Sequence, residues 1–484
     1  MEHHVGTILY DAARECPDSL ALVGDVQVTY GELHSLALRF AERLGEVARP
    51  GDGVGVFLQS NQDFVVAFFG ATYAGLTVLP FVRTLPDAEV LRRLREVRAE
   101  LLVCERSLAP EVHSIAPDGD KNASKTSGFC MIEPPSGDAL WLPTSGTSGR
   151  SKVARISHRC VSEHTRNLVR ETFRFTPDDV VLATLPLCHS FGLRTTLLAT
   201  FAAKARVLLV ERFDAKASLD AAARFDVTFI AGVPTMFAGW AQTEGEPLPT
   251  LRWCLSAGAP LSEATRRAAE ARLGAEVREG YGLTEASFTS IDAPHHQNTV
   301  GSCGLPSPGV EVRIQRREIQ IRGTNVMSGY LHDDEATSEA FEDGWLRSGD
   351  LGVIDDAGCV RVLDRLKDLI IRGGHNVVPA NVEGVLREVP SVLEAAVVGR
   401  PDARLGEELV AVLVMSSAAD GEMSNVFRYI ASRLAKPEQP REYVILSELP
   451  LGPSRKVLRR VLRGRIESGE LVPVRFAPCA TKVE

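Results

Sequence analysis

The nine residues 144–152 read Thr-Ser-Gly-Thr-Ser-Gly-Arg-Ser-Lys and follow an apolar segment at 139–142. Glycines allow backbone N–H groups to approach an anion, hydroxyls donate further hydrogen bonds, and the lysine adds a positive charge. A loop of this kind after a strand predicts phosphate binding, although a solvated turn has a similar composition. The loop is not a Walker A motif, because Ser151 stands where that motif requires a glycine before the lysine.

Length and composition limit the classes of protein to consider. At 484 residues the chain is too long for one ordinary hydrophobic core, so two or more domains are expected. A net charge of −9 argues against general binding to nucleic acid or to an anionic membrane. No uncharged apolar run approaches the length of a membrane span, and the acidic N-terminal region is not that of a signal peptide.

The nine cysteines are scattered along the chain, with an odd count and no CxxC pair. This pattern is typical of a reduced, cytoplasmic protein in which most thiols are small core residues.

The first 350 residues alternate between helical and strand-like patterns, which predicts an α/β fold with parallel sheets covered by helices on both faces. Helices are expected from Thr29 to 44, at 64–75 and around 90–97. Strands are expected at 54–58, 101–104, 180–185, 205–210, 227–230 and 251–256.

The pattern changes twice further along the chain. Short strands separated by glycines at 300–363 predict a β-rich subdomain, and the polar stretch 108–137 predicts a surface loop. A new α+β unit follows. We therefore expect a large N-terminal domain at 1–365 and a small C-terminal domain at 366–484.

Seven further motifs occur in one order after the hydroxyl-rich loop, at 186–192, 232–235, 256–261, 280–285, 344–351, 364–368 and 453–460. Together they resemble the adenylate-forming superfamily, which contains acyl- and aryl-CoA synthetases, peptide-synthetase adenylation domains and luciferases. The resemblance covers nearly the whole chain. It implies an ATP-dependent carboxylic acid ligase that forms an acyl-adenylate and pyrophosphate and then an acyl thioester, with a mobile C-terminal lid.

The resemblance assigns the phosphate end of ATP to two segments. Thr284 would donate to phosphate, and Glu285 would hold the Mg²⁺ ion that bridges phosphate oxygens. The alternative is that Glu285 is an acidic residue at a helix N-terminus, where the helix dipole stabilises its negative charge. The β- and γ-phosphates would contact Thr144, Ser145, Gly146, Thr147, Ser148, Gly149 and Lys152.

The nucleoside end is implied in the same way. Adenine would lie between the segment Gly258, Ala259 and Pro260 and the pair Gly280 and Tyr281. Small residues admit a flat base, and the tyrosine face can stack on it; plain core packing is the other role open to Tyr281. Asp350 would accept hydrogen bonds from the ribose hydroxyls with Arg365 as its companion, unless the two are only a surface ion pair.

Lys456 corresponds to the catalytic lysine of the superfamily, whose ammonium bridges the attacking carboxylate and the α-phosphate. Lys367 corresponds to the hinge. Several residues depart from the usual pattern: Val153, Arg317 and Arg455 stand where relatives have glycine, and Asn381 stands where they have glutamate. Val153 is expected to narrow the backbone freedom after Lys152. Arg455 is expected either to slow closure of the loop before Lys456 or to help bind an anion.

The acid pocket is implied by alignment, and it is mostly apolar with small walls. His189 would lie near the carboxylate and the thiol path, and Ser190 replaces the aspartate of amino-acid-activating relatives. Arg194 either pairs with a polar or anionic group of the substrate or forms a structural salt bridge. The pocket residues are Ser190, Phe191, Arg194, Ala231, Leu255, Ala257, Gly280, Phe288 and Thr289.

The thiol acceptor is left open between CoA and the phosphopantetheine of an acyl or peptidyl carrier protein. His375 would lie in the loop that lines the thiol tunnel. The basic run Arg459, Arg460, Arg463 and Arg465 would either attract the acceptor's negative charges or be an ordinary solvated helix face. From another class, the rival function is a non-catalytic protein that binds nucleotide or acyl-adenylate.

Overall fold

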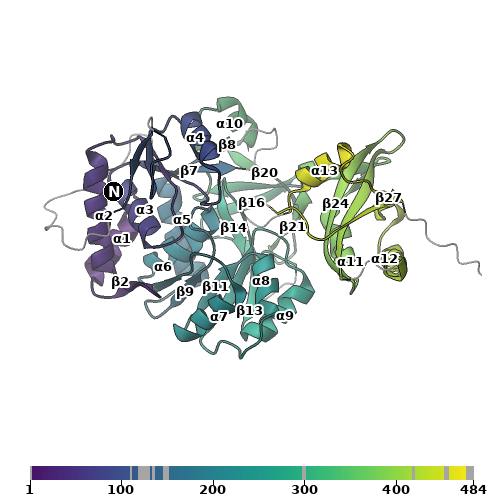
Figure 1. Cartoon of the computed structure of the whole chain (residues 1–484), viewed down its shortest axis with the longest axis horizontal. Helices are drawn as coiled ribbons and strands as arrows, with labels where there is room; N and C mark the ends of the chain where they lie inside the picture. The colour runs from purple at the N-terminus through teal and green to yellow at the C-terminus, as the bar shows by residue number, and fades with distance from the viewer. Residues whose placement is uncertain are drawn as a thin grey trace, which may run out of the picture. The chain divides into compact units, whose positions relative to one another are not determined.

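The computed structural model of the chain describes residues 3–109, 112–117, 131–132, 137–144, 152–296, 301–416, 420–451 and 457–475 (Figure 1). Two compact units are present. The first contains residues 1–313, 320–348 and 355–360, and the second contains 314–319, 349–354 and 361–484. The mixed α/β architecture predicted from the alternating patterns is confirmed.

The first unit contains a seven-stranded sheet in the order β18-β8-β7-β4-β3-β5-β6. Strands β7, β4, β3, β5 and β6 run parallel, whereas β8 and β18 are antiparallel additions at one edge. The hydroxyl-rich loop connects β7 to β8, at this edge. The bounds are β3 Gly53–Val56, β4 Thr77–Pro80, β5 Leu101–Val103, β6 His113–Ile115, β7 Asp138–Thr144, β8 Lys152–Ser157 and β18 Gly329–Tyr330.

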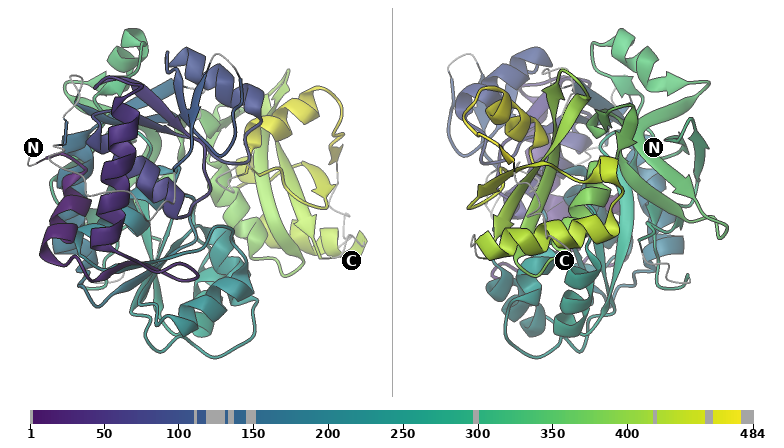
Figure 2. Two further views of the ribbon diagram at one scale, coloured as in Figure 1. Left: turned by 60° about the vertical axis from the view of Figure 1, so that its left-hand side comes forward. Right: turned by 90° about the vertical axis from the view of Figure 1, so that its right-hand side faces the viewer.

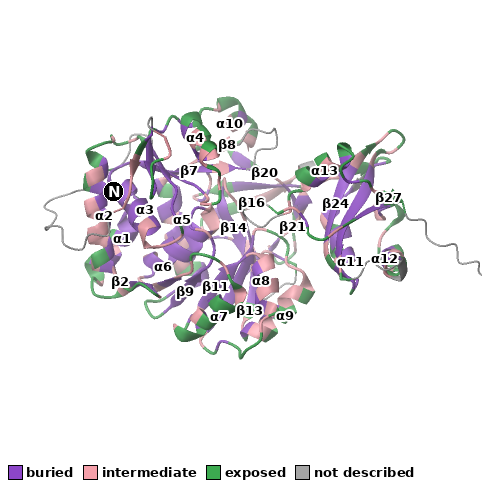
Figure 3. Cartoon of the chain, in the orientation of Figure 1, coloured by how far each residue is buried: buried purple, intermediate pink, exposed green. Residues whose placement is uncertain are grey.

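A second sheet of the same unit has nine strands in the order β15-β14-β13-β12-β11-β9-β10-β1-β2. Its centre is parallel and its two edges are antiparallel. Buried residues of these strands form a large hydrophobic cluster, and Figure 3 shows the strands mainly in the colour of buried residues. The bounds are β1 Leu20–Val23, β2 Val28–Thr29, β9 Val180–Ala183, β10 Arg206–Leu209, β11 Phe229–Gly232, β12 Trp253–Ala257, β13 Glu276–Leu283, β14 Ser287–Ile291 and β15 Leu305–Pro306.

Helices cover both sheets, as expected for largely parallel strands. Helix α2 begins with a capping box, in which Thr29 and Glu32 satisfy each other's backbone N–H groups. Helix α5 contacts β7 and β8 as well as the π-helical segment η2. The bounds are α1 Thr7–Glu15, α2 Tyr30–Gly45, α3 Gln62–Tyr73, α4 Asp87–Glu96, α5 His158–Asn167, η1 Leu168–Phe173, η2 Gly192–Leu198, α6 Ala199–Ala202, α7 Ala215–Arg224, α8 Pro234–Ala241, α9 Glu263–Leu273 and α10 Asp334–Ala340.

The predicted β-rich region is confirmed as a five-stranded sheet in the order β16-β17-β20-β19, with β21 beside β20. The polar stretch 108–137 is only partly a loop. Strand β6 lies inside it, because residues 113–115 pair with β5 and thereby extend the parallel sheet. The bounds are β16 Val310–Gln315, β17 Glu318–Gly323, β19 Phe341–Glu342, β20 Trp345–Ile354 and β21 Val360–Arg365.

The turn between β16 and β17 contains two arginines in the left-handed region, with φ of +51° at Arg316 and +68° at Arg317. A side chain with a Cβ is strained in this conformation, by roughly 1–2 kcal/mol per residue, and glycine is the preferred second residue of such a turn. We therefore expect Arg317→Gly to raise the free energy of unfolding by about 1 kcal/mol. Urea denaturation of both proteins measures the difference, and unchanged or lower stability would contradict it.

The second unit contains a six-stranded sheet in the order β23-β22-β25-β26-β27, with β24 beside β25. Its strands are seen in yellow-green in the right-hand view of Figure 2. Hydrophobic clusters lie on both sides of it, formed with α11 and α12 and with α13. The bounds are η3 Leu366–Asp368, β22 Ile370–Arg372, β23 His375–Val377, α11 Pro379–Arg387, β24 Val392–Asp402, β25 Gly406–Met415, α12 Asp420–Arg433, η4 Lys436–Glu438, β26 Glu442–Leu446, α13 Arg459–Glu467 and β27 Val474–Arg475.

Seven cysteines lie in the described parts of the chain, and all seven are free thiols. Five of them are buried, as the scattered pattern predicted. No helix within the described ranges is long and apolar enough to cross a membrane.

Candidate active site

The two ends of the hydroxyl-rich loop are held together by the sheet. Thr144 ends β7 and Lys152 begins β8, and the two residues face each other in the antiparallel ladder. Thr144 is buried. The phosphate-binding residues predicted between them, Ser145, Gly146, Thr147, Ser148 and Gly149, lie outside the described residues, as does Ser151.

Tyr330 connects the basic and the acidic residue predicted for the phosphate end. The Lys152 ammonium lies 5.0 Å from the centroid of the Tyr330 ring, in a cation–π contact. The Tyr330 hydroxyl donates a hydrogen bond of 3.0 Å to Oε1 of Glu285. Strand β18 positions the tyrosine by pairing with β8, where Tyr330 faces Ala154. A positive and a negative side chain from distant parts of the sequence thus contact the same tyrosine.

Glu285 lies in a turn between β13 and β14, and no helix begins there. The alternative of a helix N-terminal acid is therefore wrong. The Glu285 carbonyl accepts from the N–H of Met327 at 2.7 Å, which ties the turn to the segment before β18. Gly282 is required just before the turn, because a Cβ there would lie 2.1 Å from the Ser287 carbonyl oxygen. Thr284 lies in the same turn, beside Glu285.

The two segments predicted to hold adenine are neighbours in the nine-stranded sheet. Strands β12 and β13 are parallel, and Ala257 faces Gly280 at their carboxyl ends. Gly258 follows β12 with φ of +89°, and Ala259 and Pro260 are exposed. Tyr281 is buried on β13. The carboxyl edge of a largely parallel sheet is the usual position for a ligand, so the arrangement fits a base beside this edge.

Glu279, on β13, was not identified in the sequence. Its Oε2 accepts a hydrogen bond of 3.4 Å from the N–H of Leu261, at the end of the 256–261 segment. Burial raises the pKa of Glu279 from its ordinary value of 4.5 to about 7. The carboxyl group therefore ties the adenine-side segment to β13 and keeps its proton to near-neutral pH.

This raised pKa makes stability depend on pH. Between pH 4.5 and 7 the folded protein retains the proton and the unfolded chain releases it, so the contribution of Glu279 to stability falls as pH rises. Glutamine accepts the same hydrogen bond without ionising. We expect Glu279→Gln to raise the free energy of unfolding at pH 8 by up to about 3 kcal/mol, and by little at pH 4.5. Urea denaturation at both pH values checks this, and an equal effect at both would contradict it.

Asp350 and Arg365 form an ion pair, as predicted, with 2.8 Å between Asp350 Oδ1 and Arg365 Nε. Asp350 is buried on β20, whereas the Arg365 side chain is 39% exposed at the end of β21. Because the Asp350 carboxylate is buried, the two residues are not merely a surface ion pair. Lys367 lies in the short helix η3 directly after β21. Lys456 lies outside the described residues.

The predicted acid pocket is assembled mainly from adjacent strands of the nine-stranded sheet. Ala231 on β11 faces Leu255 on β12, and Ala257 faces Gly280 on β13. Phe288 on β14 continues this series, and its ring packs edge-on against that of Phe191, with 5.3 Å between the centroids. Side chains that are far apart in the sequence therefore meet in one buried hydrophobic cluster. Thr289 follows Phe288 on β14 and is buried.

His189 lies in a tight turn between β9 and η2. Its N–H donates to the Pro186 carbonyl, and its carbonyl accepts from Leu193. A Cβ at Gly192 would lie 2.4 Å from the Pro186 oxygen, so only glycine closes this turn. His189 and Ser190 are both partly buried there.

Arg194 is buried at the start of η2, and the described residues do not form the structural salt bridge considered for it. In the part of the chain that the structure describes, no carboxylate lies within ion-pair distance of its guanidinium. One terminal nitrogen donates instead to the Cys160 carbonyl on α5, at 3.0 Å.

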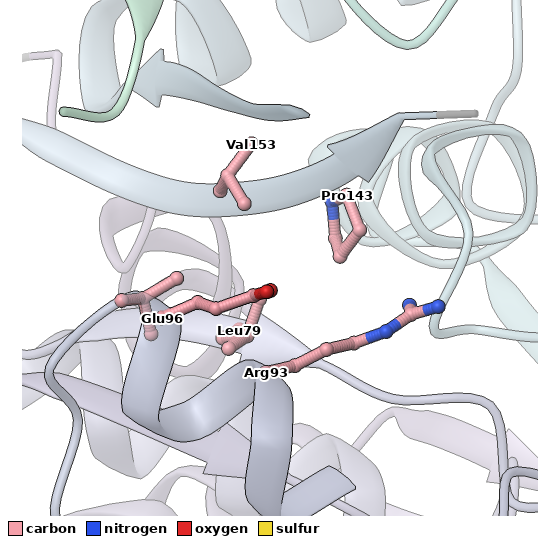
Figure 4. A pocket seen from close by; sticks show the side chains of 6 residues that line it. Leu79, Arg93, Glu96, Pro143 and Val153 are labelled. Carbon is pink, nitrogen blue, oxygen red and sulfur yellow. The ribbon is translucent and has the colours of Figure 1, made fainter. Parts of the chain in front are cut away.

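Val153, where relatives have glycine, is a regular strand residue of β8 that faces Pro143 on β7. Figure 4 shows both side chains directed toward Leu79 and α4, around a small hollow lined by Leu79, Arg93, Glu96, Val97, Pro143 and Val153. Val153 also packs on the hydrophobic cluster of that sheet. Because a β-branched side chain suits a strand, the loss of glycine is compatible with the hairpin.

The basic run in α13 is largely neutralised within its own unit. Arg459 forms a bidentate contact with Glu383 and lies 3.5 Å from Asp368, Arg463 lies 3.8 Å from Glu407, and Arg465 binds Glu470. Arg460 is exposed. The run is thus mainly an ion-paired helix face and a poor site for the acceptor's charges. His375 is exposed at the start of β23.

The sequence interpretation missed two residues of this site, Tyr330 and Glu279. Tyr330 follows Gly329 in a two-residue strand, and no local pattern connects it to Lys152 or Glu285. Glu279 directly precedes the 280–285 motif, so its position was available as a signal, although its burial was not.

Within the described ranges no group of three or more His, Cys, Asp or Glu side chains is placed to hold a metal ion. Magnesium bound to a nucleotide usually takes one or two protein carboxylates, with phosphates and water completing its octahedron. The single carboxylate of Glu285, which contacts the same tyrosine as Lys152, fits that kind of binding.

Comparison with known proteins identifies relatives along most of the chain. The family model for AMP-binding enzymes matches residues 9–331, and the model for the AMP-binding enzyme C-terminal domain matches 381–456. A feruloyl-CoA synthase of Amycolatopsis sp. is 32% identical, covering 94% of this chain and 97% of the relative.

Solved structures agree with this result. ATP-bound MatB from Rhodopseudomonas palustris is 30% identical with a TM-score of 0.89, covering 96% of this chain and 99% of that one. O-succinylbenzoate coenzyme A synthetase (MenE) from Bacillus subtilis, in complex with ATP and magnesium ion, is 30% identical with a TM-score of 0.84, covering 94% and 98%.

Proposed function

This chain belongs to the AMP-binding enzyme family, and on that premise we propose that it is an ATP-dependent carboxylic acid–CoA ligase. It joins a small carboxylic acid to the α-phosphate of ATP, releases pyrophosphate, and then transfers the acyl group to the thiol of CoA. The observation that carries the proposal is the contact of Lys152 and Glu285 with the same Tyr330 side chain.

That contact supports the assignment of the phosphate end. A carboxylate and a triphosphate repel each other, so the attack requires positive charge and hydrogen-bond donors near the phosphates. Lys152, Thr144 and the hydroxyl-rich loop supply them, and Thr284 donates beside Glu285. Glu285 would hold Mg²⁺, which supplies further charge neutralisation when bound. Tyr330 orients both charged side chains.

The nucleoside is assigned to the segments that meet at the ends of β12 and β13. Adenine would lie between Gly258–Pro260 and Tyr281, and the ribose hydroxyls would donate to Asp350, whose carboxylate is oriented by Arg365. We assign residues 1–365 to the adenylation domain and 366–484 to the lid, with Lys367 as hinge and Lys456 as catalytic lysine. The two family-model matches lie on either side of this boundary.

The acid would occupy the surface formed by Ala231, Leu255, Ala257 and Phe288, with His189 near its carboxylate. The acceptor is CoA, the thiol substrate named for the feruloyl-CoA relative. A carrier protein is the second candidate, and paired α13 arginines give it no specific support. The free thiols support a location in the reducing cytoplasm.

Acid-dependent exchange of labelled pyrophosphate into ATP, measured over a panel of carboxylic acids, tests the proposal. Exchange with at least one acid is expected, followed by thioester formation when CoA is added. Nucleotide binding without exchange for any acid would instead identify a non-catalytic binding protein. If the thioester formed only with a carrier protein, the carrier protein and not CoA would be the acceptor.

A further inference from the structure

The guanidinium of Arg194 is buried without a counter-ion. The residue is 3% exposed, and one terminal nitrogen contacts the Cys160 carbonyl and lies 3.9 Å from the Cys160 sulfur. Its Nε and Nη1 atoms have no hydrogen-bond partner among the described residues. A buried charge without a partner is strongly destabilising. The two unpaired nitrogens therefore indicate that an anion completes the site.

Helix α5 packs on this guanidinium through Cys160, and its one carboxylate, Glu163, pairs with Arg159 instead. His164 on α5 is fully buried; burial lowers its pKa well below the ordinary value, and the nearby Arg194 lowers it further. The imidazole is thus neutral and adds no competing positive charge. Neither ring nitrogen of His164 has a hydrogen-bond partner among the described residues. Thr165 on α5, Thr195 on η2 and Thr289 on β14 also have buried hydroxyls without a hydrogen-bond partner in the described part of the chain.

Strand β14 and the turn before η2 also contribute to the proposed acid pocket. Phe191 lies three residues before Arg194, and its ring packs against Phe288. The Phe288 ring packs close to Gly280, because a Cβ added at Gly280 would lie 2.8 Å from that ring. The unpaired guanidinium thus lies one helical turn from the apolar surface assigned to the acyl group, in the first unit of the chain.

We propose that the acid substrate carries a second carboxylate at its far end, and that this group is the counter-ion of Arg194, accepting a hydrogen bond from one of the two guanidinium nitrogens that lack a partner among the described residues. The inference rests on the proposed function and narrows its substrate to dicarboxylic acids. Because Nη2 donates to the Cys160 carbonyl, Nε–H and Nη1–H point to opposite sides of the guanidinium, and each offers a single charge-assisted hydrogen bond to a carboxylate oxygen. A neutral amide in the same place leaves the buried positive charge unpaired, so it is rejected.

Pyrophosphate exchange with three matched acid series tests this inference. The series are dicarboxylic acids of four to eight carbons, their monoamides, and monocarboxylic acids of the same length. The full-length protein is expected to prefer the best dicarboxylic acid over its monoamide by about 100-fold in kcat/KM. Arg194→Met should remove about 100-fold for that acid and leave the monoamide within a few-fold. Arg194→Lys should retain part of the preference.

Arg278→Met is the matched control, because Arg278 is equally buried but is paired with Asp292 at 3.2 Å. It should lower thermal stability without changing the order of acids. Equal exchange with dicarboxylic acids and their monoamides by the unaltered protein would overturn the proposal while leaving the ligase function intact. This comparison uses only the unaltered protein, so its outcome does not depend on whether a variant folds. Absence of exchange with every acid would reject the ligase function and this inference with it.

Discussion

Glu285→Gln is expected to lower kcat/KM for adenylation about 1,000-fold, since several kcal/mol of charge neutralisation at the phosphates would be lost. The amide keeps the volume of the side chain and can still accept from the Tyr330 hydroxyl, so the turn between β13 and β14 should remain folded. Pyrophosphate exchange at several magnesium concentrations measures the effect. The variant should need more magnesium for half-maximal rate.

Tyr330→Phe is the matched control for this prediction. It removes the hydrogen bond to Glu285 but keeps the ring beneath Lys152. A loss of about 10-fold is expected, because one orienting hydrogen bond to a charged group contributes about 1.5–3 kcal/mol at most. A Glu285→Gln variant that keeps the activity and magnesium dependence of the unaltered protein would remove Glu285 from the proposed site.

Lys456→Ala is expected to lower the rate of adenylation by about 100- to 1,000-fold, which is the effect of removing one group that stabilises developing charge in a transition state. The second half-reaction does not use this charge, so transfer from a supplied acyl-adenylate to CoA should persist. Single-turnover measurements of the two half-reactions separate these effects.

Arg460→Ala provides the comparison for Lys456, since Arg460 is an exposed cation four residues further along the chain. Its removal should change neither half-reaction by more than about two-fold, as is usual for a solvated surface charge. Equal losses of both half-reactions in Lys456→Ala would point to a folding defect. Full adenylation activity would show that another cation serves the α-phosphate.

The adenylation chemistry was readable from sequence because it depends on short local motifs. Hydroxyls, glycines and a lysine within nine residues predict an anion site whatever surrounds them. The motif at 280–285 places Tyr281, Thr284 and Glu285 on one strand and its following turn, which local spacing alone can indicate. The alternation of helices and strands likewise follows from periodicity along the chain.

Contacts between distant segments were beyond the reach of local patterns. Strand β6 forms only because β5 offers it an open edge, and the antiparallel addition of β18 to β8 brings Tyr330 to Lys152. The raised pKa of Glu279 depends on burial beneath neighbouring segments. Each of these outcomes is a property of packing, which the sequence order does not express.

Arg194 shows the division between sequence and tertiary structure most clearly. By itself the sequence determined the family, the order of its motifs and an unexpected arginine beside the acid pocket, since residue type and local spacing are sufficient for these. Only the tertiary structure decided that Arg194 is buried without a carboxylate partner among the described residues. The physical reason is that a buried charge is paired with whatever groups the fold packs around it, and the group that the described residues place against Arg194 is the neutral Cys160 carbonyl.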